Sequence, residues 1–314
     1  MLGRFRPSLA RTLPRTALRQ LSSSGTTYNT RASEEEVSHF NALASSWWDV
    51  EGPQRILHKM NLLRMDFVND MIRSHLKLNQ GIDDPEEQVY MPPFNVNLLP
   101  KPVRARILQE QEARRDEMLN ARRLRALDVG CGGGIFSESL ARLPYVESVK
   151  GIDLSPDVIT AAEWHRKQDP ALEGKLTYQL QAVGDVPKKE KYDVVTAFEM
   201  LEHVPYPSEI LNELFQRVED GGWVFVSTIN RDFVSWFTTI FMAESALGIV
   251  PKGTHTLEKY INEEEIRDWF SKSKHAQTFR HVKSKGSFYL PSCGWSFSDH
   301  PGTGNYFMAF QKVK

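Results

Sequence analysis

The stretch LDVGCGGGIFSESLARL, residues 127–143, carries the clearest structural signal in this chain. An apolar run ends at Val129, four glycines follow in residues 130–134, and a helical pattern begins at Ile135. Only glycine lets the backbone turn this tightly and also lets a ligand approach the N–H groups at the start of a helix. The stretch therefore predicts a strand, a ligand-binding loop and a helix, in that order.

From Leu124 onward, apolar runs alternate with helical patterns, which is typical of βαβ units on a parallel sheet. The expected strands span 125–129, 148–154, 176–183, 192–200 and 221–230, and the expected helices span 135–142, 158–166 and 208–217. A helix near 262–270 and two strand-like runs, 279–290 and 306–313, complete the pattern. Two successive strands without a helix predict an antiparallel hairpin at the edge of a mostly parallel, seven-stranded sheet. The fold class is α/β.

Three segments precede this sheet domain, which covers residues 124–314. Residues 34–78 place apolar side chains at helical spacing and predict a helical N-terminal extension. Residues 79–123 contain five prolines and a highly charged run, and predict an insertion that is partly irregular and partly a solvated helix. Residues 1–33 contain six arginines and no acidic residue, which is typical of a mitochondrial transit peptide, with a disordered basic tail as the alternative.

The composition excludes several classes of protein. A formal net charge of −1 argues against a dedicated nucleic-acid binder, so no nucleic-acid partner is expected. The only cysteines, Cys131 and Cys293, are too few for a disulfide framework or a cysteine zinc site. No stretch reaches the roughly 18 uninterrupted apolar residues of a membrane-spanning helix.

The residues around the glycine loop predict S-adenosylmethionine as the ligand. Asp153 ends the second expected strand, where a ribose-binding carboxylate belongs. Asp128, two residues before Gly130, could meet the ammonium of a methionine moiety but would repel a pyrophosphate. The loop reads G-x-G-G-G, with Gly132 as its second glycine, and not the dinucleotide pattern G-x-G-x-x-G. The order of elements also resembles that of class I methyltransferases.

The end of the third expected strand gives weaker signals for the same site. Ala182 and Val183 are placed to border an adenine, and Asp185 could accept a hydrogen bond from its amino group. Ordinary packing at a strand end is the alternative for all three.

The run TAFEMLEHVP, residues 196–205, places Glu199, Glu202 and His203 at and just beyond the end of the fourth expected strand. If the chain turns into a helix there, the three side chains point one way. Two carboxylates and an imidazole suit Mg²⁺, Mn²⁺ or Zn²⁺, which would hold two ring oxygens beside the transferable methyl group. Surface pairing of the glutamates is one alternative, and a general base at His203 is another.

Six motifs together resemble the ubiquinone-biosynthesis O-methyltransferases of mitochondria and bacteria: SSWWD (45–49), RILHKMNLLRMDF (55–67), LDVGCGGGIFSESLARL (127–143), FEMLEHVP (198–205), STINR (227–231) and VPKGTH (250–255). The resemblance implies two O-methylations, one of a 3,4-dihydroxy-5-polyprenylbenzoate and one of a demethylubiquinol. It implies a donor site with Arg64, Gly130, Asp153 and the residue at position 198, and a divalent metal on Glu199, Glu202 and His203. Position 198 is often methionine in relatives and is Phe198 here. The 79–123 insertion is expected of the eukaryotic branch.

The segment 231–255 interrupts the alternation with aromatic residues at helical spacing, within an insertion expected over 231–260. It predicts an amphipathic element that lies in the lipid headgroup region, or a lid over the active site, or both. The resemblance implies a peripheral protein on the matrix side of the inner mitochondrial membrane that works with other quinone-pathway proteins. The competing hypotheses are a metal-independent methyltransferase and a non-catalytic assembly factor.

Overall fold

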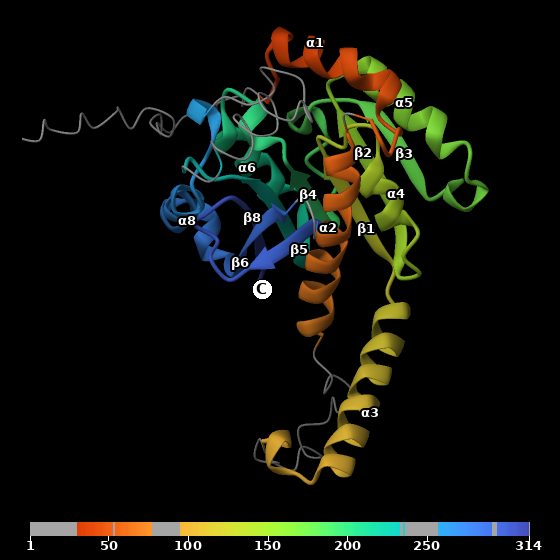
Figure 1. Cartoon of the computed structure of the whole chain (residues 1–314), viewed down its shortest axis with the longest axis vertical. Coiled ribbons are helices and arrows are strands. Elements are labelled where there is room, and N and C mark those ends of the chain that lie inside the picture. Colours follow the sequence, from red (N-terminus) through yellow and green to blue (C-terminus); the bar gives the residue numbers. More distant parts are fainter. Residues whose placement is uncertain are drawn as a thin grey trace, which may run out of the picture.

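The computed structural model describes residues 30–52, 54–76, 95–232, 235, 257–290 and 294–313. Its centre is an eight-stranded sheet in the order β3-β2-β1-β4-β5-β8-β6-β7 (Figure 1). The strands are β1 (Leu124–Val129), β2 (Val146–Asp153), β3 (Leu176–Leu180), β4 (Tyr192–Phe198), β5 (Val218–Ile229), β6 (Phe279–Leu290), β7 (Gly294–Ser298) and β8 (Asn305–Lys312). Strands β1 to β5 are parallel, as predicted.

The antiparallel edge contains one strand more than the sequence predicts. β8 lies between β5 and β6 and pairs antiparallel with both, which confirms the expected reversal. The additional strand, β7, pairs with β6 at the outer edge. The sequence of β7, GWSFS, places Trp295 and Phe297 at alternate positions, a strand-like alternation that the prediction did not include; all five residues are half-buried.

Helices cover both faces of the sheet, which explains why its central strands are apolar on both sides. In β5, Trp223 and Phe225 pack on the face covered by α2 (Arg55–Ser74), α4 (Ile135–Ala141) and α5 (Pro156–Arg166). Val224 and Val226 pack on the opposite face, against α6 (Pro207–Gln216) and α8 (Glu263–Lys272). Within the described residues this domain also contains five short 3₁₀ segments: η3 (Pro170–Leu172), η4 (Val183–Asp185), η5 (Leu201–His203), η7 (Leu257–Lys259) and η8 (Lys274–Gln277).

The N-terminal extension is helical, as predicted, and packs on the sheet domain. It contains α1 (Glu34–Leu43), η1 (Ala44–Ser46) and α2. The hydroxyl of Ser33 accepts a hydrogen bond from the N–H of Glu36 (3.3 Å), and three glutamates occupy the first turn of α1. Both features stabilise a helix start. Thr30 is already buried, so packed residues begin before residue 33, the predicted end of the transit peptide.

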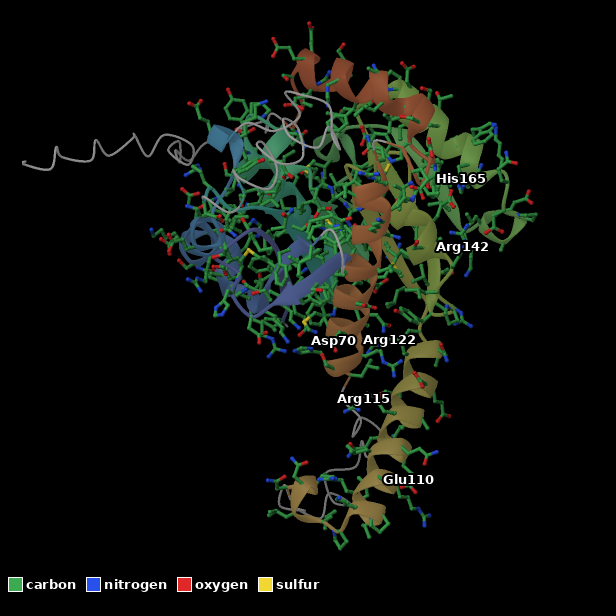
Figure 2. All side chains as sticks on the ribbon, in the orientation of Figure 1. Asp70, Glu110, Arg115, Arg122, Arg142 and His165 are labelled. Atoms are coloured by element: carbon green, nitrogen blue, oxygen red, sulfur yellow. The ribbon has the colours of Figure 1, made fainter. Side chains whose placement is uncertain are left out.

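The insertion before β1 contains η2 (Val96–Leu98) and α3 (Lys101–Asn120), a long helix that extends away from the sheet domain (Figures 1 and 2). Leu119 is the only buried residue of α3, which agrees with the solvated helix expected there. Arg73 at the end of α2 forms ion pairs with Glu112 and Asp116 of α3. Residues 79–94 of the insertion lie outside the described residues. Among the helices that are described, none is both long and apolar enough to cross a bilayer.

Candidate active site

The loop between β1 and α4 has a backbone that requires glycine. Gly130, Gly132 and Gly134 have φ angles of 72°, 54° and 90°. Residues with a side chain disfavour this left-handed region. The three glycines therefore shape a tight turn directly after the first parallel strand, at the sheet edge where ligands bind in such folds.

Asp153, the last residue of β2, is bound to this loop. Its Oδ2 accepts a hydrogen bond from the N–H of Gly132 (3.0 Å), and its Oδ1 accepts one from the N–H of Ser155 (2.9 Å). Burial raises the pKa of Asp153, and these backbone donors oppose the rise. The structure thus brings the predicted ribose-binding carboxylate beside the predicted glycine loop.

Asp128 lies inside the protein, below the loop. Its Oδ2 accepts a hydrogen bond from the hydroxyl of Ser137 (2.5 Å), and its Oδ1 accepts one from the hydroxyl of Thr196 (2.7 Å). Burial raises the pKa of Asp128, while the two hydroxyls and the charge of Arg64 act against the rise. Asp128 therefore connects β1, α4 and β4, and its contact with a donor ammonium stays a prediction.

The three residues expected near an adenine lie at η4, and not at the end of β3, which is three residues shorter than predicted. Ala182 and Val183 are buried, whereas Asp185 is exposed. The carbonyls of Val183 and Val186 accept hydrogen bonds from Arg217, whose side chain is fully buried. The guanidinium of Arg217 thus fixes the shape of η4 from below.

Arg64 and Phe198 meet at the end of β4. By its place on an amphipathic segment alone, Arg64 would be a surface charge, but it is buried with 6% of its surface exposed. Its guanidinium lies over the ring of Phe198, 5.9 Å from the centroid, and forms an ion pair with Glu199. The ring of Phe198 also packs edge-to-face on Phe136, with centroids 4.9 Å apart. The resemblance, and not the spacing, placed Arg64 here.

The predicted helical arrangement of Glu199, Glu202 and His203 is wrong. The helix there, η5, contains only three residues, and Glu199 precedes it with a φ of 46°. No other non-glycine residue in the described part of the chain has a positive φ. The three side chains therefore do not share the face of a regular helix.

Each of these side chains contacts a different partner. Glu199 binds Arg64 and accepts a hydrogen bond from the hydroxyl of Ser227, and the buried Glu202 accepts one from the hydroxyl of Thr228 (2.6 Å). The Nδ1 of His203 lies 3.0 Å from Oε2 of Glu36 in α1. In the ranges that the structure describes, no three His, Cys, Asp or Glu side chains gather as a group that could hold a metal ion.

Burial and neighbouring charges set the ionisation of this cluster. Burial raises the pKa of Glu202. Burial also disfavours the charged form of His203, but Glu36 and Glu202 outweigh this effect and raise its pKa. Burial is also the largest single effect on Glu36 and raises its pKa. The contacts with His203 and Lys259 together outweigh burial and lower this pKa to about 2. His203 and Glu36 therefore form a hydrogen-bonded pair, which becomes an ion pair when the imidazole is protonated, next to the second buried carboxyl group, Glu202.

Comparisons with known proteins agree with this architecture. A methyltransferase-domain family model matches residues 100–274. The mitochondrial ubiquinone biosynthesis O-methyltransferase of Candida albicans is 62% identical, over 91% of this chain and 86% of that protein. The protein of the same name from Saccharomyces cerevisiae is 50% identical, over 91% of this chain and 89% of that protein. The bacterial ubiquinone biosynthesis O-methyltransferase of Hydrogenovibrio crunogenus is 37% identical, over 75% of this chain and 77% of that protein.

The chain belongs to the ubiquinone biosynthesis O-methyltransferase family. It is therefore an S-adenosylmethionine-dependent O-methyltransferase. The predicted methyl donor and the predicted family are both confirmed. The non-catalytic alternative loses its support. Among solved structures, magnesium protoporphyrin IX methyltransferase from Synechocystis PCC 6803 with bound SAH has a TM-score of 0.45 and 17% identity, over 71% of this chain and 90% of that chain.

Sequence reasoning missed several side chains at the site of this ubiquinone biosynthesis O-methyltransferase. Glu36 comes from α1, and Ser227 and Thr228 come from the end of β5. The indole N–H of Trp48 donates a hydrogen bond to the carbonyl of Gly133 (2.9 Å), and Trp47 is buried beside the same loop. The SSWWD and STINR motifs contain four of these five residues, so the motifs marked the segments without giving their contacts.

Proposed function

We propose that this enzyme methylates a phenolic hydroxyl of a polyprenylated catechol or quinol, on 3,4-dihydroxy-5-polyprenylbenzoate and on demethylubiquinol. The observation that carries the proposal is the 62% identity to a ubiquinone biosynthesis O-methyltransferase over 91% of the chain. The donor contacts proposed for S-adenosylmethionine are Arg64, Asp128, Gly130, Gly132, Asp153, Ala182, Val183 and Phe198.

The reaction needs an acceptor for one proton. The phenolic oxygen attacks the methyl carbon of the sulfonium, the methyl–sulfur bond breaks, and the phenolic proton leaves. We assign this proton to His203. Glu36 holds the N–H of the imidazole at Nδ1, which makes Nε2 the accepting atom of the neutral ring. The raised pKa of His203 favours the protonated product of this step.

The predicted metal is a separate question. The three residue types suit a metal ion, but their arrangement in the structure does not. Two carboxylates and an imidazole suit Mg²⁺, Mn²⁺ or Zn²⁺. In the structure, however, Glu199, Glu202 and His203 are bound to Arg64, Thr228 and Glu36, respectively. As arranged here the three side chains do not fit a metal ion, and no step above uses one. The metal therefore stays a prediction, and the Glu36–His203 pair favours the alternative with His203 as the base.

A chelator experiment separates the two forms of the proposal. The protein is treated with EDTA, transferred to metal-free buffer, and assayed with labelled donor and a short-chain dihydroxybenzoate, with and without added Mg²⁺ or Zn²⁺. Turnover that disappears and returns only with the metal would support a metal held by Glu199, Glu202 and His203. Turnover that stays constant throughout would support the base mechanism. Label on the phenolic oxygen of the product is expected in both cases, and its absence would contradict the proposed function.

We propose that the enzyme acts at the matrix side of the inner mitochondrial membrane, because a polyprenyl tail dissolves poorly in water. Relatives named as mitochondrial proteins and the acid-free arginine-rich residues 1–33 support the compartment.

The segment proposed to contact lipid, 231–255, lies largely outside the described residues. Its deletion is expected to lower binding to liposomes far more than affinity for S-adenosylhomocysteine. Equal losses would indicate a folding defect. Association with other quinone-pathway proteins stays a prediction.

A further inference from the structure

We propose that residues 30–48, here called the N-terminal strap, retain the methyl donor in its site, and that the stacked pair of Trp48 and His165 fastens the strap. Trp48 and His165 are thus positioning residues of the donor site. The inference rests on the donor site proposed above, since a strap that retains a donor needs a donor beneath it.

The strap crosses the sheet at the edge where the donor is expected. It forms one contact with the loop that follows each of β1, β2, β3 and β4, at distances between 2.5 and 3.2 Å. These contacts pair Trp48 with Gly133, Asn41 with Ser155, Thr30 with Gly184, and Glu36 with His203. In open α/β sheets, ligands bind outside the carboxyl ends of the strands. The strap therefore covers this crevice on one side.

The side chain of Trp47 explains why residue 133 is a glycine, although the backbone conformation there does not require one. Gly133 lacks the positive φ of its neighbours, so its backbone would accept a side chain. A Cβ atom at Gly133, however, would lie 2.2 Å from Cδ1 of Trp47, and one at Gly132 would lie 2.4 Å from Cζ2 of Trp47. The indole thus lies directly against the donor loop, with only 5% of its surface exposed. The loop is shaped to receive the strap as well as the donor.

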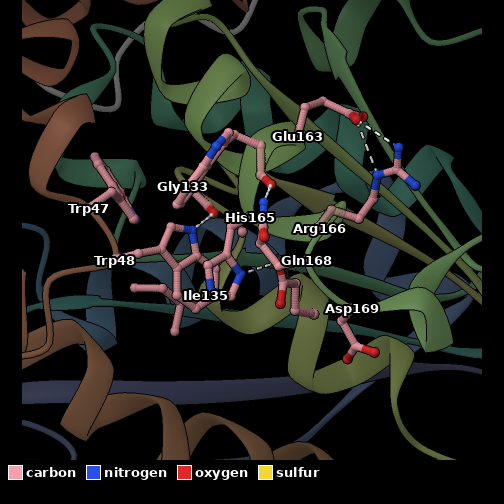
Figure 3. Close-up of polar contacts among 12 residues, drawn as sticks. Trp47, Trp48, Gly133, Ile135, Glu163, His165, Arg166, Gln168 and Asp169 are labelled. Carbon is pink, nitrogen blue, oxygen red and sulfur yellow. Dashed lines mark hydrogen bonds and ion pairs between the residues drawn. The ribbon is translucent and has the colours of Figure 1, made fainter.

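The Trp48 indole is held from three directions, as Figure 3 shows for the first two. Its N–H binds Gly133, and its ring stacks on His165 with centroids 3.3 Å apart and planes 3° apart. His58 of α2 packs edge-on to the same indole, with centroids 5.5 Å apart. Trp48 thus connects the strap to the donor loop, to α5 and to α2.

His165 is itself held from below by a buried carboxylate. Its Nδ1 lies 2.8 Å from Oε1 of Glu138, a residue of α4 with no exposed surface. Arg142 donates to the other oxygen of Glu138 (3.0 Å) and pairs with Asp169. Figure 2 labels His165 beside α5 and Arg142 at the end of α4. The fastening is therefore built from side chains that are not among the proposed donor contacts.

The location of this fastening gives the proposal a specific consequence. Donor entry and product release through this edge require the strap to lift, which breaks the contact of Trp48 with Gly133 and its stack on His165. Weakening either contact should therefore speed dissociation of S-adenosylhomocysteine more than it slows methyl transfer. A merely structural role would not produce this difference.

The experiment measures the dissociation rate of S-adenosylhomocysteine by stopped-flow displacement in the full chain. Trp48→Phe keeps the stacked ring and removes the N–H, whereas His165→Gln removes the ring and keeps a polar side chain facing Glu138. Each is expected to raise the dissociation rate about tenfold, which corresponds to about 1.4 kcal/mol. The matched control is Trp164→Phe, because Trp164 neighbours His165 on α5 and is 62% exposed. It is expected to leave the rate at the wild-type value.

A second measurement, the single-turnover rate with donor bound in advance, separates retention from folding. The proposal predicts that this rate falls less than twofold in Trp48→Phe and His165→Gln, at unchanged melting temperatures. Wild-type dissociation rates in both variants would overturn the strap. A lower single-turnover rate together with a lower melting temperature, without faster dissociation, would overturn it as well. If the wild-type protein does not bind S-adenosylhomocysteine at all, the donor site proposed above fails, which is a different result.

Discussion

The side chains of His203 and Glu36 are hydrogen-bonded, Nδ1 to Oε2 at 3.0 Å, although 167 positions separate them in the sequence. The pair joins α1 to the turn after β4, so the N-terminal extension contributes a side chain to the proposed active site. Phe40 of the same helix packs edge-to-face on the imidazole, with centroids 5.0 Å apart. The orientation of the proposed base therefore depends on a helix that lies outside the methyltransferase domain itself.

Glu36→Gln tests this dependence. A neutral amide cannot stabilise the imidazolium that forms during the reaction, so the single-turnover rate with saturating donor is expected to fall about tenfold. Glu35→Gln is the matched control, because Glu35 neighbours Glu36 and is exposed. A rate for Glu36→Gln that equals the control rate would show that Glu36 does not assist the base.

Asp153→Asn tests the donor site. The carboxylate accepts from two backbone N–H groups, and an amide can replace only one of these acceptors while its NH₂ opposes the other. The dissociation constant of S-adenosylhomocysteine, measured by calorimetry, is expected to rise at least about tenfold, or about 1.4 kcal/mol. Asp157→Asn, an exposed residue on the following helix, should bind as the wild type does. Equal affinities of the two variants would remove Asp153 from the donor site.

Three glycine-to-alanine variants separate backbone strain from steric overlap. At Gly134, φ is 90° and a Cβ atom would lie 2.0 Å from the hydroxyl of Tyr178, so both penalties apply. At Gly174, φ is 75° with no atom within 4 Å, and at Gly302 neither penalty applies. We expect free energies of unfolding in urea to fall by about 3 kcal/mol, about 1 kcal/mol and less than about 0.5 kcal/mol, respectively. A different order would contradict the loop geometry.

His275 makes folding stability depend on pH. Burial lowers its pKa to about 4, with a smaller effect of Lys274, because the imidazole stacks on Phe215 and is 5% exposed. The unfolded chain binds this proton more tightly, so stability is full above about pH 6.5 and falls as the pH drops toward 4. The loss is at most about 3 kcal/mol. His275→Gln should reduce the difference between urea midpoints at pH 7.5 and pH 5.0, and an unchanged difference would contradict this account.

The glycine loop between β1 and α4 and its contact with Asp153 could be predicted from the sequence because their determinants are local. Gly130 and Gly132 follow an apolar strand and precede a helix, and Asp153 ends the next strand along the chain. The strand order of βαβ units then brings the loop and the carboxylate together. The parallel part of the sheet was predicted correctly for the same reason.

The arrangement around Glu199 could not be predicted, because it depends on distant residues. Arg64 and Ser227 bind the carboxylate of Glu199, and the backbone at Glu199 adopts a positive φ in place of a helix. The i, i+3 and i+4 spacing places side chains on one face only in a regular helix, and this segment does not form one. Trp48 and Glu36 were missed because nothing near them in the sequence indicates contacts with Gly133 and His203.

We propose methyl transfer to a phenolic oxygen with His203 as the proton acceptor. Its most direct test is the turnover of labelled S-adenosylmethionine with a short-chain 3,4-dihydroxy-5-prenylbenzoate by the wild type and by His203→Ala. We expect label on the phenolic oxygen and a loss of about 100-fold or more in the variant, which should still bind S-adenosylhomocysteine. Equal turnover by the two proteins, or no label on the phenolic oxygen, would contradict the account.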